Sequence, residues 1–578
     1  MSTTTPQEAT TCDLLVIGSG AGGLSAAVTA AWHGLKVIVA EKEPVFGGTT
    51  AWSGGWMWIP GNPLAKRAGI DEDPAAFRTY LQHELGNHYD EAIIEAYLRT
   101  GPEMVTFFEE HTAVRFIDGN RVPDFHGRTP AAGTGGRSVC AAPYDGRQLG
   151  SLLGRLRPPL TEITFMGMGI AAGADLGHFL NVTRSLPSAL HVARRFGKHL
   201  IDLALHRRGM QLVNGNALVA RLLKSAADLG VQLWEAAPAQ RLLIENGAVR
   251  GAVLATAAGE RTVHARHGTL LACGGFPHDA ARQQRLFPHA AMGQRHWSAA
   301  PRTNTGDGLR LGETAGGHVD EALAAPAAWA PVSLVPRGDG TFGHFPHLIE
   351  RAKPGLIAVR ADGRRFANEA DSYHDVMGAL LAATGPGEEV AAWLVCDHRF
   401  QRRYGLGFAK PAPLPLLPYL RSGYLKRGAT LGELARACGI DAAGLEQTVA
   451  TFNRDAERGE DPAFGRGSTA YNRIQGDAGH GPNPCVAPIA QGPFYAVKIV
   501  PGSLGTFAGL RTDAFARVLG QDGQPIPGLY AGGNDMAAVL GGTYPAGGIT
   551  LGPAMTFGYI AARHAAGLAD RTHAAAAA

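Results

Sequence analysis

The sequence predicts an α/β protein in which a discontinuous Rossmann-like domain is interrupted by an inserted α+β domain. A short apolar strand, a glycine-rich turn and an alanine-rich helix follow one another directly after the polar first residues. A strand, glycine-rich turns and a helix return in the same order over 529–565. Between these segments, from about 329 to 493, isolated strands alternate with longer helical stretches. This arrangement is typical of a parallel sheet whose chain leaves for a second domain and then returns.

The N-terminal segment has the order of a dinucleotide-binding fingerprint. Leu14–Ile17 is a short apolar run, as expected of a buried parallel strand. The glycine turn 18–23, a helical pattern over 24–32 and a second strand over 36–40 follow, and that strand ends at Glu41. The pattern Gly-x-Gly-x-x-Gly between strand and helix, with an acid after the next strand, predicts a nucleotide site.

Each glycine of this turn has a separate physical role in the prediction. Gly18 makes the tight turn, Gly20 lets the backbone approach a pyrophosphate, and Gly23 lets the helix and the strand pack closely. The N-terminus of the helix then faces the phosphates. Glu41 is placed where a carboxylate can accept hydrogen bonds from the ribose hydroxyls.

Composition narrows the classes of function. The 578 residues are 45% hydrophobic and 18% charged, and the 78 glycines suit a backbone that approaches a large ligand at many points. A net charge of +3 gives no argument for nucleic acid. The six cysteines lack metal-ligand spacing, which predicts reduced thiols in a cytoplasmic protein and no metal. No signal peptide or membrane span is predicted, and the alanine run 574–578 is predicted to be a disordered or foreign tail.

A second block of Gly, Thr and Ser, at 47–55, distinguishes between the common dinucleotides. A NAD-binding domain has no need for it, whereas an FAD enzyme does, because the chain must run along the pyrophosphate and the ribityl chain toward the flavin ring. With the phrase EKEPVFGGTTAWSGGWMWIP, the sequence resembles the succinate dehydrogenase/fumarate reductase superfamily of flavoproteins and, within it, the 3-ketosteroid Δ1-dehydrogenases. The resemblance implies a GR2-type FAD-binding domain with FAD as its cofactor.

The resemblance assigns FAD-binding residues to both ends of the chain. Segments 268–275 and 304–308 would close the domain around the cofactor. The last helix would point its N-terminus at the flavin pyrimidine edge, where the helix dipole stabilises negative charge. The predicted cofactor set is Gly18, Gly20, Ala21, Gly22, Gly23, Glu41, Lys42, Gly48, Thr49, Thr50, Ser53, Gly54, Gly55, Ala272, Gly274, Asn304, Asp307, Gly533, Asn534, Gly548, Thr550 and Leu551.

The domain boundaries are placed where the composition and the predicted secondary structure change along the chain. We expect an FAD-binding part over 1–328, a catalytic or cap domain over 329–493, and the returning FAD-binding part over 494–578. The first part contains a helical excursion over 62–210, and apolar spacing of three and four residues predicts helices over 62–112.

Two stretches of the excursion have unusual composition. Residues 116–154 are rich in Gly, Pro and Arg, which predicts a long functional loop. Residues 184–210 are basic and amphipathic, which favours a surface helix packed on its apolar stripe. A membrane-surface helix, suited to a lipid-like substrate, is the alternative and would make this a peripheral membrane protein. The stripe consists of Leu186, Leu190, Ala193, Phe196, Leu200 and Leu203.

Dehydrogenation beside a ketone needs a group that polarises the carbonyl, a base for the α-proton and an acceptor for the β-hydride. The resemblance implies that Tyr544 and the amide of Gly548 bind the carbonyl oxygen, that Tyr373 takes the α-proton, and that N5 of FAD takes the hydride. A tyrosine base needs help from its site because its ordinary pKa is near 10. The predicted activity is Δ1-desaturation of a 3-ketosteroid or similar apolar cyclic ketone in steroid degradation, with a quinone-type or artificial electron acceptor.

The sequence departs from the family at the proton relay. The family has a relay tyrosine in a PDYY-like phrase, whereas this chain reads PDFH. Phe125, which we expect to face the substrate, cannot transfer a proton. His126 or Tyr144 could substitute for it, although either could equally be structural.

Three alternatives stay open. One is a desaturase of a smaller cyclic ketone, and another is a fumarate-reductase-like alkene reductase. The segment 503–510 lacks the histidine of that branch, and Tyr373-His374 stands where its arginine would be, so the cationic groups for a dicarboxylate are missing. The third alternative is an FAD-binding protein without enzymatic activity.

Overall fold

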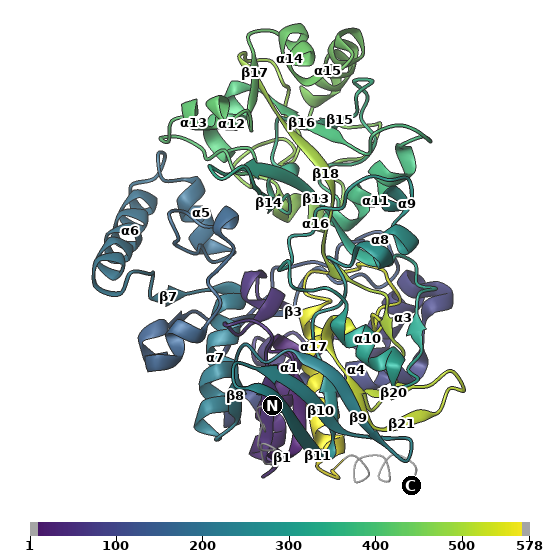
Figure 1. Ribbon diagram of the computed structural model, residues 1–578. Helices are drawn as coiled ribbons and strands as arrows, with labels where there is room; N and C mark the ends of the chain where they lie inside the picture. The colour runs from purple at the N-terminus through teal and green to yellow at the C-terminus, as the bar shows by residue number, and fades with distance from the viewer. Residues whose placement is uncertain (1–9, 569–578) are drawn as a thin grey trace, which may run out of the picture.

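A computed structural model describes residues 10–568, so the predicted tail 574–578 and most of the polar N-terminus lie outside the described residues. The lower half of Figure 1 contains an eight-stranded sheet with the order β20-β21-β11-β1-β2-β8, to which β10 and β9 add a hairpin beside β11. β21, β11, β1, β2 and β8 run parallel. The bounds are β1 Thr10–Ile17, β2 Val37–Ala40, β8 Gln232–Trp234, β9 Ala239–Glu245, β10 Ala248–Thr256, β11 Gly259–Leu271, β20 Arg517–Leu519 and β21 Pro525–Ala531.

Two helices from opposite ends of the chain pack together on this sheet. They are α1 (Ala21–Trp32), which follows β1, and α17 (Leu551–Ala565), which closes the described chain; both are almost wholly buried. A Cβ at Gly558 would lie 2.4 Å from the Gly22 carbonyl oxygen, so only glycine permits this approach. Ser25 Oγ donates across the contact to the Met555 carbonyl at 3.2 Å. The two ends of the chain thus form one domain, as the sequence predicts.

The inserted domain forms the upper half of Figure 1 around an antiparallel sheet of order β14-β13-β18-β16-β15, with β17 beside β18. The predicted boundary at 493 falls just before β18, which pairs with β13, β16 and β17 and therefore belongs to this sheet. The strands are β13 Ala327–Pro336, β14 Phe342–Pro346, β15 Leu356–Val359, β16 Ala392–Cys396, β17 Lys426–Gly428 and β18 Phe494–Thr506. The helices are α11 Tyr373–Ala383, α12 His398–Tyr404, α13 Leu417–Arg421, α14 Leu431–Cys438, α15 Ala442–Ala456 and α16 Ala470–Gln475.

The excursion between β2 and β8 begins with the predicted helices, α2 (Pro63–Arg67), α3 (Pro74–Leu85) and α4 (Glu91–His111). The stretch 116–154 is not the continuous loop that we predicted. It contains β4 (Phe116–Asp118) and β5 (Ser138–Ala141), and β5 pairs with β3 (Trp56–Trp58) beside the second glycine block. The remaining elements are α5 Ala174–Leu180, α6 Leu186–His206, α7 Asn214–Asp228, α8 Ala280–Leu286, α9 Pro288–Ala291, α10 Asp307–Thr314, β6 Tyr144–Asp145, β7 Gln211–Leu212, β12 Val319–Asp320, β19 Gly509–Leu510, and the 3₁₀ segments η1 Gly48–Trp52, η2 Gly86–His88, η3 Gly146–Arg155, η4 Thr161–Ile163, η5 Glu350–Ala352 and η6 Gly533–Asp535.

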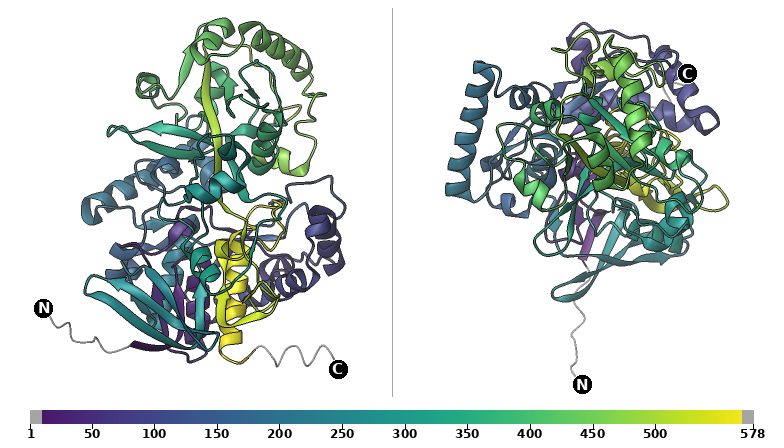
Figure 2. Two further views of the ribbon diagram at one scale, coloured as in Figure 1. Left: turned by 45° about the vertical axis from the view of Figure 1, so that its right-hand side comes forward. Right: turned by 90° about the horizontal axis from the view of Figure 1, so that it is seen from above.

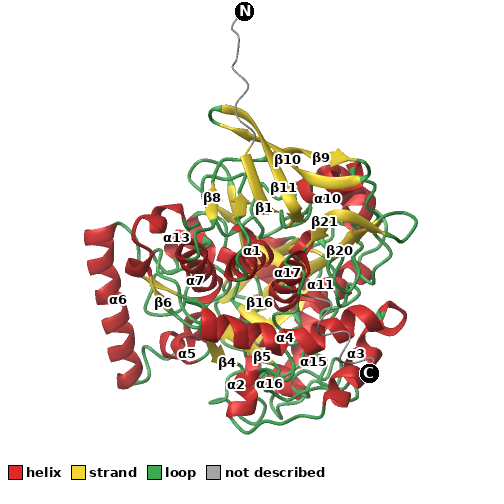
Figure 3. Cartoon of the chain, turned by 90° about the horizontal axis from the view of Figure 1, so that it is seen from below, coloured by secondary structure: helices red, strands yellow, loops and turns green. Residues whose placement is uncertain are grey.

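Helix α6 stands at the side of the molecule, apart from both sheets (Figures 1, 2 and 3). The interpretation that it packs on its apolar stripe is wrong, because Leu186 and Leu190 are 73% and 63% exposed. Its buried residues are instead Ser188, His199 and Asp202. The helix therefore buries polar side chains and leaves Leu186 and Leu190 of the stripe in water.

No helix in the described part of the chain is long and apolar enough to cross a bilayer. All six cysteines are unpaired. The cytoplasmic location stays a prediction.

The close packing of α1 on α17 can be tested at Gly558. We expect Gly558→Ala to lower the stability by about 1–3 kcal/mol, because the added methyl group overlaps backbone atoms that cannot move away. Thermal unfolding and retention of bound flavin would measure the loss. Gly378→Ala in α11 is the matched control, since a Cβ there meets nothing within 4 Å and the substitution favours a helix. An equal stability of the two variants would contradict the packing argument.

Candidate active site

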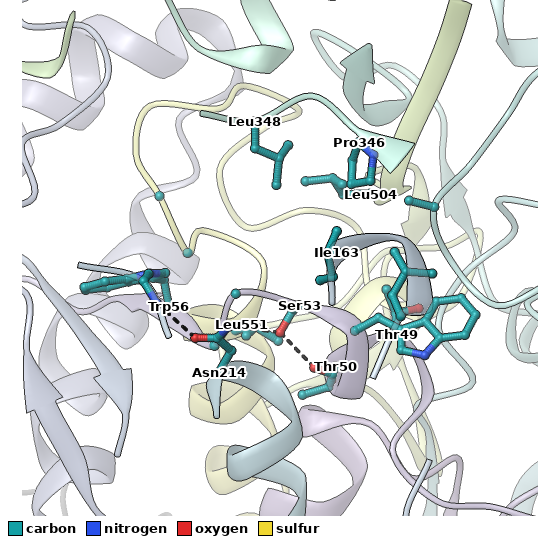
Figure 4. Close-up of a pocket in the computed structure, with 18 of the residues that line it drawn as sticks. Thr49, Thr50, Ser53, Trp56, Ile163, Asn214, Pro346, Leu348, Leu504 and Leu551 are labelled. Atoms are coloured by element: carbon teal, nitrogen blue, oxygen red, sulfur yellow. Dashed lines mark hydrogen bonds between the residues drawn. The ribbon is translucent and has the colours of Figure 1, made fainter. Parts of the chain in front are cut away.

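One cavity of about 1690 Å³ runs between the two sheets and is lined by residues of both domains. Pockets for a single small ligand typically measure about 300–1,000 Å³, so this cavity has room for a cofactor and a substrate. Figure 4 shows its character: Thr49, Thr50 and Ser53 lie along one side, and Pro346, Leu348 and Leu504 from the inserted domain lie on the other. One wall is therefore rich in hydroxyl groups and the facing wall is apolar.

The glycine turn after β1 leaves space at one end of the cavity. Gly18 has φ +106°, and a Cβ there would lie 2.1 Å from the Ala272 carbonyl oxygen. A Cβ at Gly22 would lie 3.1 Å from the Gly533 amide, at the turn that precedes the last helix. The turn thus lies so close to the ends of β11 and β21 that side chains at Gly18 and Gly22 would crowd the backbone there. A large ligand can approach the backbone at this point.

The carboxylate after β2 is held in place by its neighbours. Ser19 Oγ donates to Glu41 Oε2 at 2.5 Å, and the Glu43 amide donates to Oε1 at 3.0 Å. Burial raises the pKa of Glu41, while the hydrogen bond from Ser19 lowers it. Nearby, Lys42 Nζ forms an ion pair with Asp307 Oδ2 at 2.5 Å, which joins β2 to α10. The acid is thus fixed at the cavity wall.

The loops that follow β11 and β21 are tied together by a buried carboxylate. Asp535 Oδ2 accepts from the Cys273 amide at 2.5 Å, and Oδ1 accepts from the Gly275 amide at 2.9 Å. Asn304 Nδ2 adds a hydrogen bond of 3.0 Å to Thr49 Oγ1, which joins the entrance of α10 to η1. Burial raises the pKa of Asp535 to about 6. Segments from four parts of the sequence therefore form one continuous wall.

Every residue of the predicted cofactor set lines this cavity except Gly23. Gly23 lies behind the turn, where a Cβ would be 2.1 Å from the Gly18 carbonyl oxygen, which is the helix–strand packing that we assigned to it. The set offers free backbone near the glycine turn, a fixed carboxylate and a row of hydroxyl groups. These groups fit the diphosphate, ribose and ribityl parts of FAD.

The predicted catalytic side chains meet at the inserted-domain end of the cavity. Tyr373 is the first residue of α11, whose N-cap Ser372 accepts a hydrogen bond from the Asp375 amide. The ring centroids of Tyr373 and Tyr544 are 5.1 Å apart, and Phe125 lies 5.8 Å from each. The three rings come from widely separated segments and form one aromatic wall.

Gly548 completes this group. It has φ +100°, and a Cβ there would lie 2.6 Å from the Met57 amide nitrogen. Its own amide has no acceptor among residues 10–568. A backbone donor without a partner beside a tyrosine hydroxyl is what a carbonyl oxygen requires.

Burial dominates the electrostatics of the aromatic wall. It raises the pKa of Tyr373 well above its ordinary value, as does the neighbouring Tyr544 hydroxyl, whereas the guanidinium of Arg351 acts in the opposite direction. Burial also raises the pKa of Tyr544 to about 12 and lowers that of His374 to about 4. At neutral pH the Tyr373 and Tyr544 hydroxyls and the His374 ring are therefore uncharged.

Neither residue considered as a substitute relay lines the cavity. His126 lies between two carboxylates, Glu84 and Asp375, and Tyr144 lies against the Arg221 guanidinium. The side chain that packs on Phe125 is Tyr471 of α16, whose ring centroid is 4.3 Å away and which does line the cavity. Sequence reasoning missed Tyr471, because only the fold brings α16 to this point.

Comparisons with known proteins identify the family of the chain. The family model described as an FAD binding domain matches residues 13–551. The chain is 43% identical to the 4-oxocyclohex-2-ene-1-carboxylate 5-dehydrogenase of Sinomonas cyclohexanicum, over 97% of this chain and 94% of that protein. It is 38% identical to the 3-oxosteroid 1-dehydrogenase of Mycobacterium tuberculosis, over 97% and 99% of the two chains. The chain belongs to the FAD-dependent 3-ketosteroid Δ1-dehydrogenase family.

A solved structure of this family has the same fold. The crystal structure of 3-ketosteroid delta1-dehydrogenase from Sterolibacterium denitrificans in complex with 1,4-androstadiene-3,17-dione matches with a TM-score of 0.88 and 35% identity, over 96% of this chain and 99% of that one. The predicted family, α/β fold and FAD cofactor are confirmed. The chain is an FAD-dependent oxidoreductase, and its family dehydrogenates cyclic ketones.

The His126 ion pairs beneath α11 have a pH dependence that can be measured. Burial lowers the pKa of His126, but the hydrogen bonds to Asp375 and Glu84 outweigh it and raise the pKa to about 10. The charged form therefore stabilises the fold fully below about pH 6.5, and this contribution is lost as the pH rises through about 10. We expect His126→Gln to lower the melting temperature at pH 7 and to have little effect above pH 10.

The exposed His83 provides the control, since His83→Gln should leave the melting temperature unchanged across this range. A deficit of His126→Gln that does not depend on pH would show that packing, and not charge, accounts for its effect.

Proposed function

We propose that this protein removes two hydrogens from the carbon–carbon bond beside the carbonyl of an apolar cyclic ketone, in the manner of a Δ1-desaturase of 3-ketosteroids. The observation that carries the proposal is the meeting of Tyr373, Tyr544 and the unpartnered Gly548 amide in one buried part of the cavity. The rings are close enough to act on adjacent atoms of one substrate.

In this proposal the carbonyl oxygen accepts hydrogen bonds from the Tyr544 hydroxyl and the Gly548 amide. These two donors stabilise the negative charge that develops on oxygen when the α-proton leaves. Tyr373 takes that proton, and the buried Arg351 is the cation that favours its ionised form. Bound FAD would supply the hydride acceptor. Its predicted holders are the glycine turn, Glu41, η1 and the turn before α17.

Two sizes of cyclic ketone are candidate substrates. A steroid nucleus suits the apolar wall, and the name of the Mycobacterium tuberculosis relative favours it. The name of the Sinomonas relative favours a single six-membered ring. The fumarate-reductase alternative is disfavoured, because His374, which stands in place of that branch's arginine, is neutral at neutral pH and does not line the cavity. A quinone-type or dye electron acceptor is proposed on the resemblance alone.

Removal of either tyrosine hydroxyl tests whether Tyr373 is the base and whether Tyr544 binds the carbonyl oxygen. We expect Tyr373→Phe and Tyr544→Phe each to lower kcat/KM by at least about 10²-fold, since a positioned base contributes about 10²–10⁴ and an oxyanion donor about 10²–10³. A dye-coupled assay with 3-ketosteroids and cyclohexanones would measure it. Tyr495→Phe is the control, because Tyr495 does not line the cavity.

The pH dependence of kcat/KM tests independently whether Tyr373 is the base. Because burial raises the pKa of Tyr373, kcat/KM should rise with pH from 7 to beyond 9 without reaching a plateau. If both substitutions leave turnover within threefold of the wild type, the acid–base assignment is wrong.

We also propose that α6 rests on a membrane surface. Its outward face carries Leu186, Leu190, Ile201 and Leu205, all at least 60% exposed. Its inward face is partly polar, with His191 and Arg195 paired to Asp175, and partly apolar where it lines the cavity. The four outward side chains are left in water, and covering them would be favoured by about 25 cal/mol per Å² of apolar area buried.

The charges around this face favour an anionic lipid surface. Arg184, Arg194, Lys198 and Arg207 are exposed and form no ion pair with any residue of 10–568, while the single acid of α6, Asp202, is buried and paired with Arg147. Ala189, Val192 and Phe196 of the same helix line the cavity. An apolar ketone dissolved in the bilayer would thus find the cavity wall directly behind the contact surface.

Vesicle binding tests this contact. We expect the protein to float with vesicles that contain phosphatidylglycerol, and Leu190→Asp/Ile201→Asp to bind them at least about tenfold more weakly, because two apolar side chains leave the lipid. Turnover of a water-soluble ketone should stay unchanged. Ile244→Asp, on an exposed apolar residue of β9, is the control and should still bind. Equal flotation of both variants would refute the contact.

A further inference from the structure

The inserted domain contributes two lysines to the cavity wall. Lys410 follows α12 and Lys353 follows η5, and both line the cavity. Sequence reasoning gave neither a role, because isolated lysines in the phrases FAKP and RAKP carry no motif. Both are partly buried, which is unusual for lysine without a charged partner.

Lys410 has aromatic neighbours and no counter-ion. Its ammonium group lies 5.3 Å from the Phe408 ring centroid and 5.9 Å from that of Phe345. It forms no salt bridge with any carboxylate of residues 10–568. The rings offer only cation–π attraction, which does not replace the hydration that the charge loses.

Lys353 is similarly placed. Its Nζ donates one hydrogen bond of 2.6 Å to the Gly476 carbonyl, at the end of α16, and forms no ion pair with residues 10–568. An ammonium group carries three donors, so two remain for a ligand. Lys353 thus offers a second positive charge at the cavity wall.

The neighbouring acids do not cancel these charges. Asp477 is the carboxylate that most favours the charged form of Lys353, but it is paired with Arg403. Glu350 lines the cavity and favours the charged form of both lysines, but its Oε1 forms a short hydrogen bond with His347 Nδ1. His347 Nε2 in turn bonds Ser333 Oγ at 2.7 Å, which draws the glutamate toward the buried interior. This end of the cavity holds more positive than negative charge.

The two lysines stand apart from the nucleotide end. The glycine turn and Glu41 belong to the FAD-binding sheet, whereas Lys353, Lys410 and their neighbours belong to the inserted domain. Helix α16 connects this region to the reaction site. The Gly476 carbonyl at its end accepts a hydrogen bond from Lys353, and its Tyr471 packs on Phe125. A single substrate can therefore reach both Lys353 and the aromatic wall.

We propose that Lys410 and Lys353 bind a carboxylate of the substrate, so that the substrate is a cyclic ketone with an acid group remote from its carbonyl. This inference rests on the proposed dehydrogenation. A carboxylate would give each ammonium group the charge-assisted hydrogen bond that the protein does not supply. The carbonyl would remain at Tyr544 and Gly548. Burial lowers the pKa of Lys410 to about 8, so carboxylate binding should weaken as the pH rises through that value.

A matched pair of ketones tests the proposal with the FAD-loaded enzyme. The probes are 4-oxocyclohexanecarboxylate and its methyl ester, and the 17-carboxylic acid of a 3-keto-4-ene steroid and its methyl ester. We expect at least one acid to have a KM about 10–100-fold lower than its ester, as one or two charge-assisted hydrogen bonds would give. Lys410→Met and Lys353→Met should each reduce this preference, mainly by raising the KM for the acid. Lys410→Arg should retain most of it, and Lys36→Met, on the exposed surface, all of it.

Direct binding separates this inference from the proposed reaction. If the acids bind by calorimetry in a lysine-dependent manner but no ketone is oxidised, the carboxylate site stands and the dehydrogenation fails. If acids and esters are turned over with equal KM, or if the lysine variants keep the preference, the dehydrogenation stands and the carboxylate site is refuted. The site is refuted also if neither acid binds at pH 7.

Discussion

The contact between α1 and α17 is the constraint on which the cavity depends. Gly22 and Gly558 allow these helices to touch through their backbones, and this brings the turn after β1 beside the turn after β21. The contact holds the second turn, which carries Gly533, close to the first. The volume available to the cofactor is thus set by two missing side chains. Asp535 fixes the same junction from the other side, through the amides of Cys273 and Gly275.

The inserted domain presents different chemical groups to the cavity than the FAD-binding sheet does. The FAD-binding sheet presents backbone and hydroxyl groups, whereas the inserted domain presents rings, aliphatic side chains and a few isolated charges. Tyr373 lies on a helix of one domain, and Tyr544 precedes a helix of the other. Their separation is therefore a property of the interface between the domains. Both hydroxyls are buried, so their acidity is governed by what the cavity holds rather than by water.

Local motifs predicted much of the fold and of the cofactor site. The turn 18–23 and the strand, helix and acid around it are fixed by neighbours in sequence, and the structure has them where expected. Non-local pairings were not predictable in this way. β5 is only four residues long, and it is a strand because β3 lies beside it. β18 likewise joins its sheet through β13 and β16, which lie far from it in the sequence.

The amphipathic pattern of α6 shows a further limit of prediction from the sequence. The period of apolar residues identified α6 as a helix but could not say which side faces the protein. Inside the cavity, Tyr471, Lys353 and Lys410 belong to no motif, and only tertiary packing brings them to the wall. By contrast, Phe125 was expected at the substrate and does line the cavity, since its phrase could be compared with a family pattern. Tertiary context therefore determines the part of the cavity wall that no motif marks.

The junction of the chain's two ends has a consequence for biosynthesis. β11 needs β21 as its neighbour, and α1 needs α17 to cover its small-residue face, yet β21 and α17 are made only after the inserted domain. During translation β1, β2 and β11 therefore have an open edge and an uncovered helix while the whole inserted domain emerges. Closing a loop of this length is slow compared with local folding, and open edges invite association. The nucleotide-binding fold, although its first strands precede the inserted domain, is completed only after α17 has left the ribosome.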